Sequence, residues 1–356
     1  MVKKNIPVTL SDVARLAGVS KAVASRALSG KNRPISADKK ARVLEAAESL
    51  GYVANPFAQS LSSNETGLIA IVVNHISDVS DLTLFDSLIQ AIQSIGKQAL
   101  FVRLQSLQDI DDLQKNAFIQ RVDAALILSD LIEPELAESL FYTNNVIMLN
   151  GKSQELGYSV KVNEEPGIKS AIAHARNRGI TQAVLIAGRK SSANEADRVS
   201  HYLNHFNQNK IELVSSAFCN YSYDDALAHL NASDIKNNES IAIFCTSDSM
   251  AMAAVDYLKA KNIDAYSHRI FGFDNTEFSR RGDYQFSTIG FDKNEFVQAI
   301  IAVITQAQTQ IIGNTQTENL GSSAENLEST STDNKKWLTN PASHLTIKTQ
   351  FYLNQS

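Results

Sequence analysis

The sequence predicts a small N-terminal all-α domain with a helix-turn-helix layout, followed by an α/β body of two doubly wound parallel-sheet subdomains. Three observations lead to this expectation. Capping and glycine signals divide the first fifty residues into three short helical segments. From Gly67 onward, apolar runs alternate with amphipathic segments, which is the pattern of parallel sheets covered by helices. At 356 residues, the chain is also longer than one hydrophobic core usually supports.

The first two helices are predicted by local signals. Thr9 stands three residues before Asp12, so the hydroxyl and the carboxylate can cap the start of a helix. Gly18 then permits a turn, and Ser20 is suited to cap a second helix over residues 21–28. The apolar positions expected to face each other are Val13, Ala17, Val19, Val23, Ala27 and Leu28. The positions left on the outer side, where the second helix is free to enter a groove, are Lys21, Ala22, Ser25 and Arg26.

A third helix is expected to begin after Ser36, which caps it, and to end at Gly51. The inner positions that complete the core are Val43, Ala46, Ala47 and Leu50.

Charge is divided unevenly along the chain. Residues 1–62 hold ten basic residues against four acidic ones, a net charge of +6, so the net charge of −5 for the whole chain leaves −11 on the rest. A basic module on an acidic body suits phosphate binding at one end only. Charge alone leaves a merely solvated basic surface open as the alternative.

The alternating body pattern begins after a segment with little apolar periodicity, residues 55–66, which is expected to join the domains. Strands are expected at 67–74, 98–104, 124–129, 146–151, 159–163, 182–188, 211–218, 240–247, 269–275 and 345–353. Helices are expected near 82–96, 108–120, 134–144, 166–178, 195–209, 224–231, 249–262 and 294–306. The polar tract at 313–336 is predicted to be a loop of undetermined function.

These patterns define the expected domains. The helix-turn-helix domain covers residues 1–54, a hinge helix and linker cover 55–66, and the remaining domain covers 67–356. Within it, the N-subdomain is expected at about 67–162 plus 293–315, and the C-subdomain at about 163–292 plus 340–356.

Composition and motifs exclude several classes. The chain is 44% hydrophobic without a run long enough for a membrane span, and its start lacks the apolar region of a secretory signal, so a cytoplasmic protein is expected. Cys219 and Cys245 lie in apolar stretches and are interpreted as buried hydrophobic residues. Phosphate-binding glycine loops, nucleophile motifs and metal-ligand spacings are missing, so we expect no catalytic residues, no metal and no cofactor.

The first sixty residues contain several motifs together. The sequence T-L-S-D-V-A-R-L-A-G-V-S begins at Thr9, and the pair Ser25-Arg26 follows in the second helix. The third helix ends in Gly51-Tyr52, and N-P-F-A-Q-S-L begins at Asn55. With these motifs the chain resembles the LacI/GalR family of bacterial transcriptional regulators. The resemblance continues more loosely to the final strand, and it implies a repressor with a periplasmic-binding-protein-like effector domain.

The resemblance implies a DNA-binding surface with distinct roles. Lys21, Ala22 and Arg26 match positions that face base edges, with Ser20 and Ser25 nearby. Arg26 is expected to read guanine, because a guanidinium can bind it in a bidentate way. The residues that match phosphate-holding positions are Thr9, Ser11, Ser36 and Asn55. Relatives often have T-V-S-R where this chain has V-A-S-R at 23–26, so a different operator sequence is expected.

The linker matches the hinge of that family. Ala58 and Leu61 occupy its small and apolar positions, and Leu61 is expected to insert into the minor groove at the operator centre. A hinge helix that folds when two copies meet on DNA would couple dimer geometry to operator affinity. The chain has no apolar heptads after the final strand, so a homodimer is expected.

The resemblance also implies a small-molecule effector, most simply a carbohydrate, held between the subdomains. The residues that match effector contacts are Asn74, Phe85, Asn150, Arg198, Tyr221, Ser247, Asp248, Asp274 and Phe291. Asp248 is equally well interpreted as a helix cap. Asn150 and Ser247 replace the more common Asp and Asn, so an unusual effector is expected. In the motif around Arg198, His201 replaces a glycine.

Alternatives remain at this point. The α/β domain alone suits a stand-alone sugar or nucleoside sensor, although the basic N-terminal domain argues against this alternative. An enzyme acting on a sugar would need catalytic carboxylates in the cleft, for which two aspartates are weak support. Family members also include regulators that need a corepressor rather than an inducer, and the sequence does not choose between them.

Overall fold

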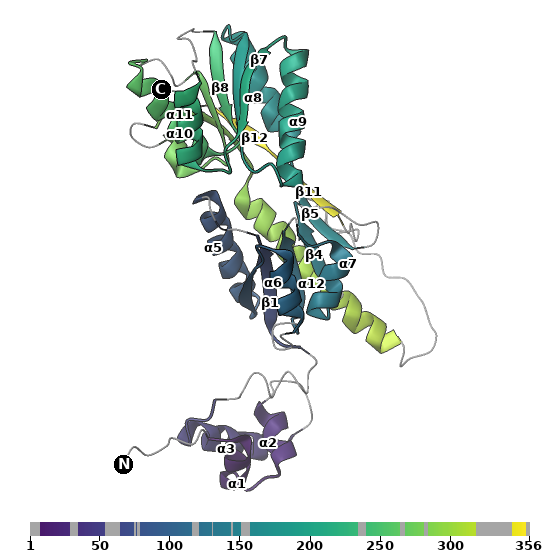
Figure 1. Cartoon of the computed structure of the whole chain (residues 1–356). Coiled ribbons are helices and arrows are strands. Elements are labelled where there is room, and N and C mark those ends of the chain that lie inside the picture. Colours follow the sequence, from purple (N-terminus) through teal and green to yellow (C-terminus); the bar gives the residue numbers. More distant parts are fainter. Residues whose placement is uncertain are drawn as a thin grey trace, which may run out of the picture. The chain divides into compact units, whose positions relative to one another are not determined.

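The computed structural model divides into two compact units, residues Met1–Gly67 and Leu68–Ser356, which we call the head and the body (Figure 1). It describes residues 8–28, 35–53, 65–74, 76, 79–115, 121–129, 131–143, 145–150, 157–233, 240–263, 268–280, 284–317 and 344–353. Most of the expected linker, including Asn55, Ala58 and Leu61, and most of the polar tract lie outside the described residues.

The head contains three helices, α1 (Leu10–Leu16), α2 (Lys21–Leu28) and α3 (Ala37–Ser49). The expected capping pair is confirmed: the amide of Asp12 donates to the Thr9 hydroxyl, and the Asp12 carboxylate accepts from the Thr9 amide. The Ser20 hydroxyl likewise accepts from the amide of Val23 at 3.3 Å. Ser36 is the N-cap residue of α3, but its side chain makes no capping hydrogen bond there, so the expected hydroxyl cap is wrong.

A small core joins the three helices of the head. Its buried members are Val13, Ala14, Ala17, Ala24, Ala27, Val43, Ala46 and Ala47. Ala24 is fully buried and Val23 only half-buried, so the structure places Ala24 rather than Val23 at the centre of the α2 contact. Alanine at the contact positions allows α2 to approach both neighbouring helices closely.

The first sheet of the body has the strand order β11-β5-β4-β3-β1-β2. Its strands are β1 (Leu68–Val73), β2 (Gln98–Arg103), β3 (Ala124–Leu128), β4 (Val146–Leu149), β5 (Tyr158–Asn163) and β11 (His344–Lys348). Its helices are α5 (Val79–Ser94), α6 (Leu107–Gln114), α7 (Pro134–Phe141) and α12 (Lys293–Thr317). Ile69 and Ile71 of β1 pack in the cluster formed with α5 and α12, whereas Ala70 and Val72 pack in the cluster formed with α6 and α7. Helices therefore cover both faces of this sheet.

The second sheet has the order β12-β10-β9-β8-β6-β7. Its strands are β6 (Gln182–Ala187), β7 (Glu212–Phe218), β8 (Ile241–Cys245), β9 (Ile270–Phe273), β10 (Ser287–Gly290) and β12 (Gln350–Tyr352). Its helices are α8 (Glu165–Asn177), α9 (Ala193–Gln208), α10 (Tyr223–Ala232) and α11 (Asp248–Ala260), and a 3-10 turn covers Glu277–Arg280. Helices α8 and α9 share one apolar cluster with the sheet, and α10 and α11 share another. Two doubly wound sheets are thus confirmed; the first is parallel throughout, and the second is parallel except for its edge strand β12, which is antiparallel to β10.

The structure corrects two expectations for the end of the body. The C-subdomain was expected to include all of 340–356, but β11 pairs in parallel with β5 of the first sheet, and only β12 joins the second. Strand β10 was not expected, because its four residues, Ser287–Gly290, form a run that is shorter than most strands. Local patterns identify strands but do not assign them to one of two similar sheets.

The chain passes between the two sheets after β5, after β10 and between β11 and β12. Thr349, in the last crossing, connects two of these segments: its hydroxyl donates to the carbonyl of Glu164 at 2.9 Å and accepts from the amide of Gly167 at 3.1 Å. In the described part of the chain, no helix is long and apolar enough to cross a membrane.

Candidate functional site

Helix α2 of the head presents one face to solvent. Lys21, Ala22, Ser25 and Arg26 are all exposed, whereas Ala24 and Ala27 on the other side are buried. The Arg26 Nε donates to the carbonyl of Ala22 at 3.2 Å, which directs the side chain along the helix surface. The four residues that the sequence assigns to base recognition therefore share one exposed face of one helix.

The predicted phosphate contacts lie near the starts of the three helices. Thr9 is the N-cap of α1, Ser11 is in its first turn, Ser20 precedes α2, and Ser36 is the N-cap of α3. All four side chains are exposed. Because free amides and the helix dipole make N-termini favourable for anions, this placement suits phosphate oxygens. Asn55, Ala58 and Leu61 lie outside the described residues, and their roles stay predictions.

The body contains a pocket with a volume of about 520 Å³. Its walls come from the ends of β3, β4 and β5, the segment before α7 and the N-terminal half of α9. The polar lining includes the amides of Asn150, Asn163 and Asn194. Residues that follow the carboxyl ends of parallel strands converge at one edge of a sheet, which is where α/β folds bind ligands.

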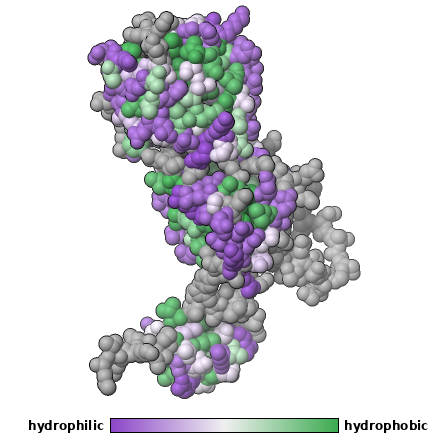
Figure 2. All heavy atoms as spheres, in the orientation of Figure 1, coloured by the Kyte–Doolittle hydropathy of each residue, from purple (hydrophilic) through white to green (hydrophobic). Residues whose placement is uncertain are grey.

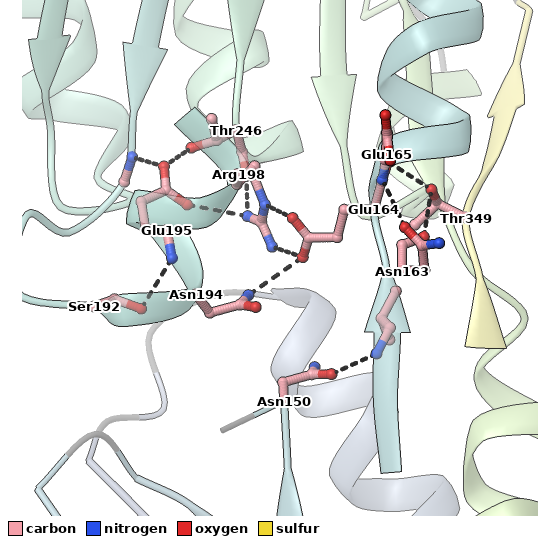
Figure 3. A network of polar contacts seen from close by, with 12 residues as sticks. Asn150, Asn163, Glu164, Glu165, Ser192, Asn194, Glu195, Arg198, Thr246 and Thr349 are labelled. Atoms are coloured by element: carbon pink, nitrogen blue, oxygen red, sulfur yellow. Dashed lines mark hydrogen bonds and ion pairs between the residues drawn. The ribbon is translucent and has the colours of Figure 1, made fainter. Parts of the chain in front are cut away.

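Asn150 lines the pocket, and its side-chain oxygen is hydrogen-bonded to the backbone. It follows β4 in a left-handed backbone conformation, with φ of 55°, which asparagine tolerates better than most residues. Its side-chain oxygen accepts from the amide of Val162 at 2.8 Å (Figure 3). Asn150 is thus both a pocket-lining residue and a tie between the ends of β4 and β5.

Arg198 is buried behind the pocket wall, in an ion-pair network with two carboxylates (Figure 3). Its Nε and Nη2 each donate to Glu164 at 2.7 Å. Its Nη1 donates to Glu195 at 3.2 Å and to the carbonyl of Thr246 at 3.0 Å. The guanidinium also lies 4.0 Å from the centre of the Phe273 ring. Burial alone would lower the pKa of Arg198, but the charge and hydrogen bonds of Glu164, followed by Glu195, raise it well above its usual value.

Glu195 is fully buried and surrounded by donors. One of its oxygens accepts from the amide of Gly188 at 2.5 Å and from the hydroxyl of Thr246, and the other accepts from Tyr221 at 2.8 Å and from Arg198. Burial, more than any other cause, raises the pKa of Tyr221 far above its usual value, so this hydroxyl remains a donor. Sequence reasoning missed Glu195, although its spacing of three residues before Arg198 on one helix was a usable signal.

Glu164 is the second carboxylate that sequence reasoning missed. It lies between β5 and α8, lines the pocket, and accepts from Arg198 and from the side chain of Asn194 at 3.2 Å. Its position directly after strand β5 and before Pro166 at a helix start was the available signal. Arg198 and Asn194 together fix the Glu164 carboxylate against the pocket wall.

Three other predicted effector residues lie in the second half of the body. Ser247 is the N-cap of α11, and its hydroxyl accepts from the amide of Met250. Asp248, at the first position of α11, accepts from the amide and hydroxyl of Thr276, both at 2.7 Å, and from the hydroxyl of Thr288 at 2.6 Å. Asp274 follows β9 with a φ of 105°. None of the three is among the lining residues of this pocket.

The remaining predicted effector residues belong to the first sheet and its surroundings. Asn74 follows β1 and accepts from the hydroxyl of Ser129, which lines the pocket. Phe85 is buried against Phe101, and Phe291 packs edge to face on Phe296, both with ring centres 5.3 Å apart. Of the predicted set, Asn150 alone is among the described lining residues. Asn74 contacts the lining residue Ser129 and Arg198 contacts the lining residue Glu164, whereas Tyr221 bonds to Glu195, which does not line the pocket. Their effector roles stay predictions.

The lining contains charged residues that sequence reasoning did not assign to the site. These are Glu133, Lys161, Glu164, Asp197 and His201. Of His201, the sequence showed only that it replaces a glycine. Asp197 and His201 lie one turn apart on α9, which is the spacing of neighbours on one helix face.

Comparisons with known proteins agree with this arrangement. Residues 9–55, which include α1, α2 and α3, match the family model described as bacterial regulatory proteins, lacI family. The chain is 26% identical over 333 residues to the probable HTH-type transcriptional repressor ExuR of Bacillus subtilis (strain 168), covering 87% of this chain and 96% of that protein. It is 24% identical over 283 residues to catabolite control protein A of Priestia megaterium, covering 76% and 84%.

Solved structures share the fold of the whole chain. The Lac repressor dimer bound to operator and the anti-inducer ONPF superposes with a TM-score of 0.76 at 20% identity, covering 98% of both chains. A complex of the transcriptional regulator CelR with cellobiose gives a TM-score of 0.59 at 18% identity, covering 98% and 99%. The head of this chain thus matches the helix-turn-helix model of the lacI family of bacterial regulatory proteins, and the chain as a whole has the fold of the Lac repressor.

Proposed function

We propose that this protein is a sequence-specific transcriptional regulator, most simply a repressor, that binds operator DNA as a homodimer. A small polyhydroxylated effector in the pocket of the body changes its affinity for the operator. The observation that carries this proposal is the exposed face of α2, with Lys21, Ala22, Ser25 and Arg26, in a helix-turn-helix domain that matches the lacI family. Relatives named as a repressor and a catabolite control protein support it.

Charge supports a role of the head on DNA. The net charge of +6 in residues 1–62 favours approach to phosphates, and the −11 of the remainder disfavours contact of the body with them. Exposed hydroxyls at the helix N-termini fix the register on the backbone, and Arg26 reads a base. The hinge roles of Ala58 and Leu61 are part of this proposal.

The pocket supports a role of the body in effector binding. Amide groups from Asn150, Asn163 and Asn194 offer both donors and acceptors, which is the complement that hydroxyl-bearing ligands require. Similar folds have been solved with cellobiose and with the anti-inducer ONPF. Figure 2 shows hydrophilic and hydrophobic residues interspersed on the visible face of the body.

The test of DNA recognition is selection of the full chain against a palindromic operator library, followed by anisotropy titrations of the selected duplex at several salt concentrations. We expect specific binding that weakens steeply as salt rises. Arg26→Ala is expected to lose about 1–3 kcal/mol of specific affinity, roughly 5- to 150-fold, and to relax sequence preference at one base pair.

The matched control is Arg15→Ala, which removes one exposed positive charge from α1 instead of α2. This variant is expected to weaken binding to specific and random duplexes by similar factors, because it reports charge alone. An Arg26→Ala variant with unchanged sequence preference would contradict the assignment of base reading, and a wild-type chain without any preference would contradict the proposed function.

A regulator is expected to perform no chemistry on its effector. The cytoplasmic location and the lack of catalytic activity belong to this proposal. Recovery of the bound ligand unchanged after prolonged incubation checks the lack of catalytic activity. Turnover of the ligand at a rate proportional to protein concentration would favour an enzyme instead.

A further inference from the structure

We propose that the effector pocket selects ligands without an anionic group, so that it takes a neutral or amino-bearing polyhydroxylated compound in preference to a sugar phosphate or a uronate. This inference rests on the proposed function and concerns the chemical class of the ligand. It follows from the distribution of formal charge in and behind the pocket wall.

The lining itself has an excess of negative charge. Glu133, Glu164 and Asp197 contribute three carboxylates, and Lys161 contributes one ammonium group. Among the described residues of the lining, two negative formal charges therefore remain. A protonated His201 would cancel one of them and leave the lining negative. An anion that enters this pocket meets net repulsion at every protonation state of the histidine.

The layer behind the wall does not reverse this balance. Arg198 is the group best suited to bind a phosphate or carboxylate in a bidentate way, but its Nε and Nη2 form that geometry with Glu164. Its Nη1 donates to Glu195 and to the carbonyl of Thr246. Since Arg198 and Glu195 are both buried and carry opposite charges, they cancel each other as seen from the pocket.

A competing anion would have to displace Glu164 from Arg198. That carboxylate is only 6% exposed and is also held by Asn194, so its displacement would leave a buried charge without its partner. The energetic cost of such a change is large in protein interiors. The guanidinium is consequently a structural counter-ion in this pocket and not an anion receptor.

The uncharged lining fits hydroxyl groups. Ser129, Asn150, Asn163, Ser191 and Asn194 supply hydroxyl and amide groups around the same volume. Carboxylates next to them add strong acceptors for ligand O–H or N–H donors. A ligand rich in hydroxyls satisfies both kinds of group without adding negative charge.

The test uses matched ligands that share a carbon skeleton and differ in charge. Glucose, glucosamine, glucose 6-phosphate and glucuronate form one such set, and the corresponding galactose compounds and the neutral disaccharides cellobiose and lactose extend it. The full chain is screened by thermal shift, and binders are titrated by calorimetry at low ionic strength, where surface charges are least screened. We expect the neutral or amino member of a set to bind at least tenfold more tightly than its phosphate or carboxylate member.

Charge variants separate this inference from simple shape selection. The double variant Glu133→Gln with Asp197→Asn removes two carboxylates from the lining and keeps its volume nearly constant. We expect it to improve the affinity for the anionic member relative to the neutral member by roughly threefold for each charge, as Coulomb interactions across several ångströms of aqueous pocket imply. The control is Asp111→Asn with Glu138→Gln, which makes the same change in net charge at exposed residues outside the lining. Its ligand preference should equal that of the wild type.

The outcomes are distinguishable. An anionic derivative that binds more tightly than its neutral parent, or a pocket variant that matches the control, contradicts the inference and leaves the proposed function intact. Failure of every polyhydroxylated compound to bind contradicts the effector part of the proposed function itself, and the inference with it.

Discussion

The head and the body differ in how far their candidate functional side chains are exposed to solvent. On the head, every described residue assigned to DNA has an exposed side chain, and most of them lie in or next to one short helix. In the body, Phe85, Arg198, Ser247 and Asp248 are all buried, and the polar members of this group are bonded to other parts of the chain. The function proposed for the head therefore depends on one helix face, whereas the function proposed for the body depends on networks that also hold the fold together.

This difference predicts how the two regions respond to substitution. Changes on the exposed face of α2 should alter binding with little effect on stability, because surface substitutions away from caps and buried contacts rarely change it by more than about 0.5 kcal/mol. Changes in the Arg198 network should alter stability first. The following variants test this contrast in order of decreasing expected effect.

The largest effect is expected for Arg198→Ala. The variant leaves Glu164 and Glu195 buried without their positive partner, which typically costs about 3–5 kcal/mol. Urea unfolding of the body should show this as a large drop in the midpoint. Arg198→Lys, which retains the charge without the planar fork, is expected to lose less.

A stable Arg198→Ala variant that had lost only its response to the effector would reverse our interpretation. It would make Arg198 a ligand contact and not a counter-ion of the two glutamates. The matched change on the head is Arg26→Ala, for which thermal unfolding should be unchanged.

The next effect is expected for Gly188→Ala. A Cβ atom at this position would lie 1.9 Å from the Tyr221 ring, and the amide of Gly188 donates to Glu195. The ring must move away from its hydrogen bond with Glu195, at a cost of about 1–3 kcal/mol of the free energy of unfolding. Ser25→Ala, on the exposed face of α2, is the control and should unfold as the wild type does; equal midpoints for both variants would contradict the packing argument.

The smallest effect is expected for the capping pair of Thr9 and Asp12 in the head, whose contribution to stability depends on pH. Hydrogen bonds from the Thr9 side chain, followed by its backbone amide, lower the pKa of Asp12 below 3.8. Because the folded pKa is lowered, the ionised carboxylate stabilises α1 above about pH 3.8, and this contribution is lost as the pH falls through the folded value. Carbon-13 titration of the Asp12 carboxyl group in the full chain should give a midpoint below 3.8, and Asp12→Asn should lack the corresponding loss of head stability on acidification.

The same contrast explains which features were predictable from sequence. The capping pair Thr9 and Asp12, the outer face of α2 and the alternation of strands and helices depend on neighbours within a few residues, and all three are confirmed. The assignment of β11 to the first sheet depends on pairing between residues 344–348 and 159–163, almost two hundred residues apart, which no local pattern contains.

The candidate pocket was predictable only in part. Asn150 and Arg198 were both identified by resemblance, but the partners of Arg198, Glu164 and Glu195, were missed. A charged side chain on a helix does not reveal whether it faces solvent or a buried carboxylate until the elements are packed. The predicted aromatic residues Phe85 and Phe291 lie in or against the apolar core of the first sheet. Their sequence positions do not show whether the rings face a ligand or the core, because that depends on how the elements pack.

The most direct test of the central claim, that the head reads DNA and the body controls it, is a single pair of titrations. The full chain is titrated into its selected operator with and without a saturating amount of the compound that raises its melting temperature most. We predict a change in operator affinity of about fivefold or more, the usual range of coupling between two sites, and a steep dependence on salt in both titrations. Identical affinities in the two titrations, with the ligand demonstrably bound, would contradict the account.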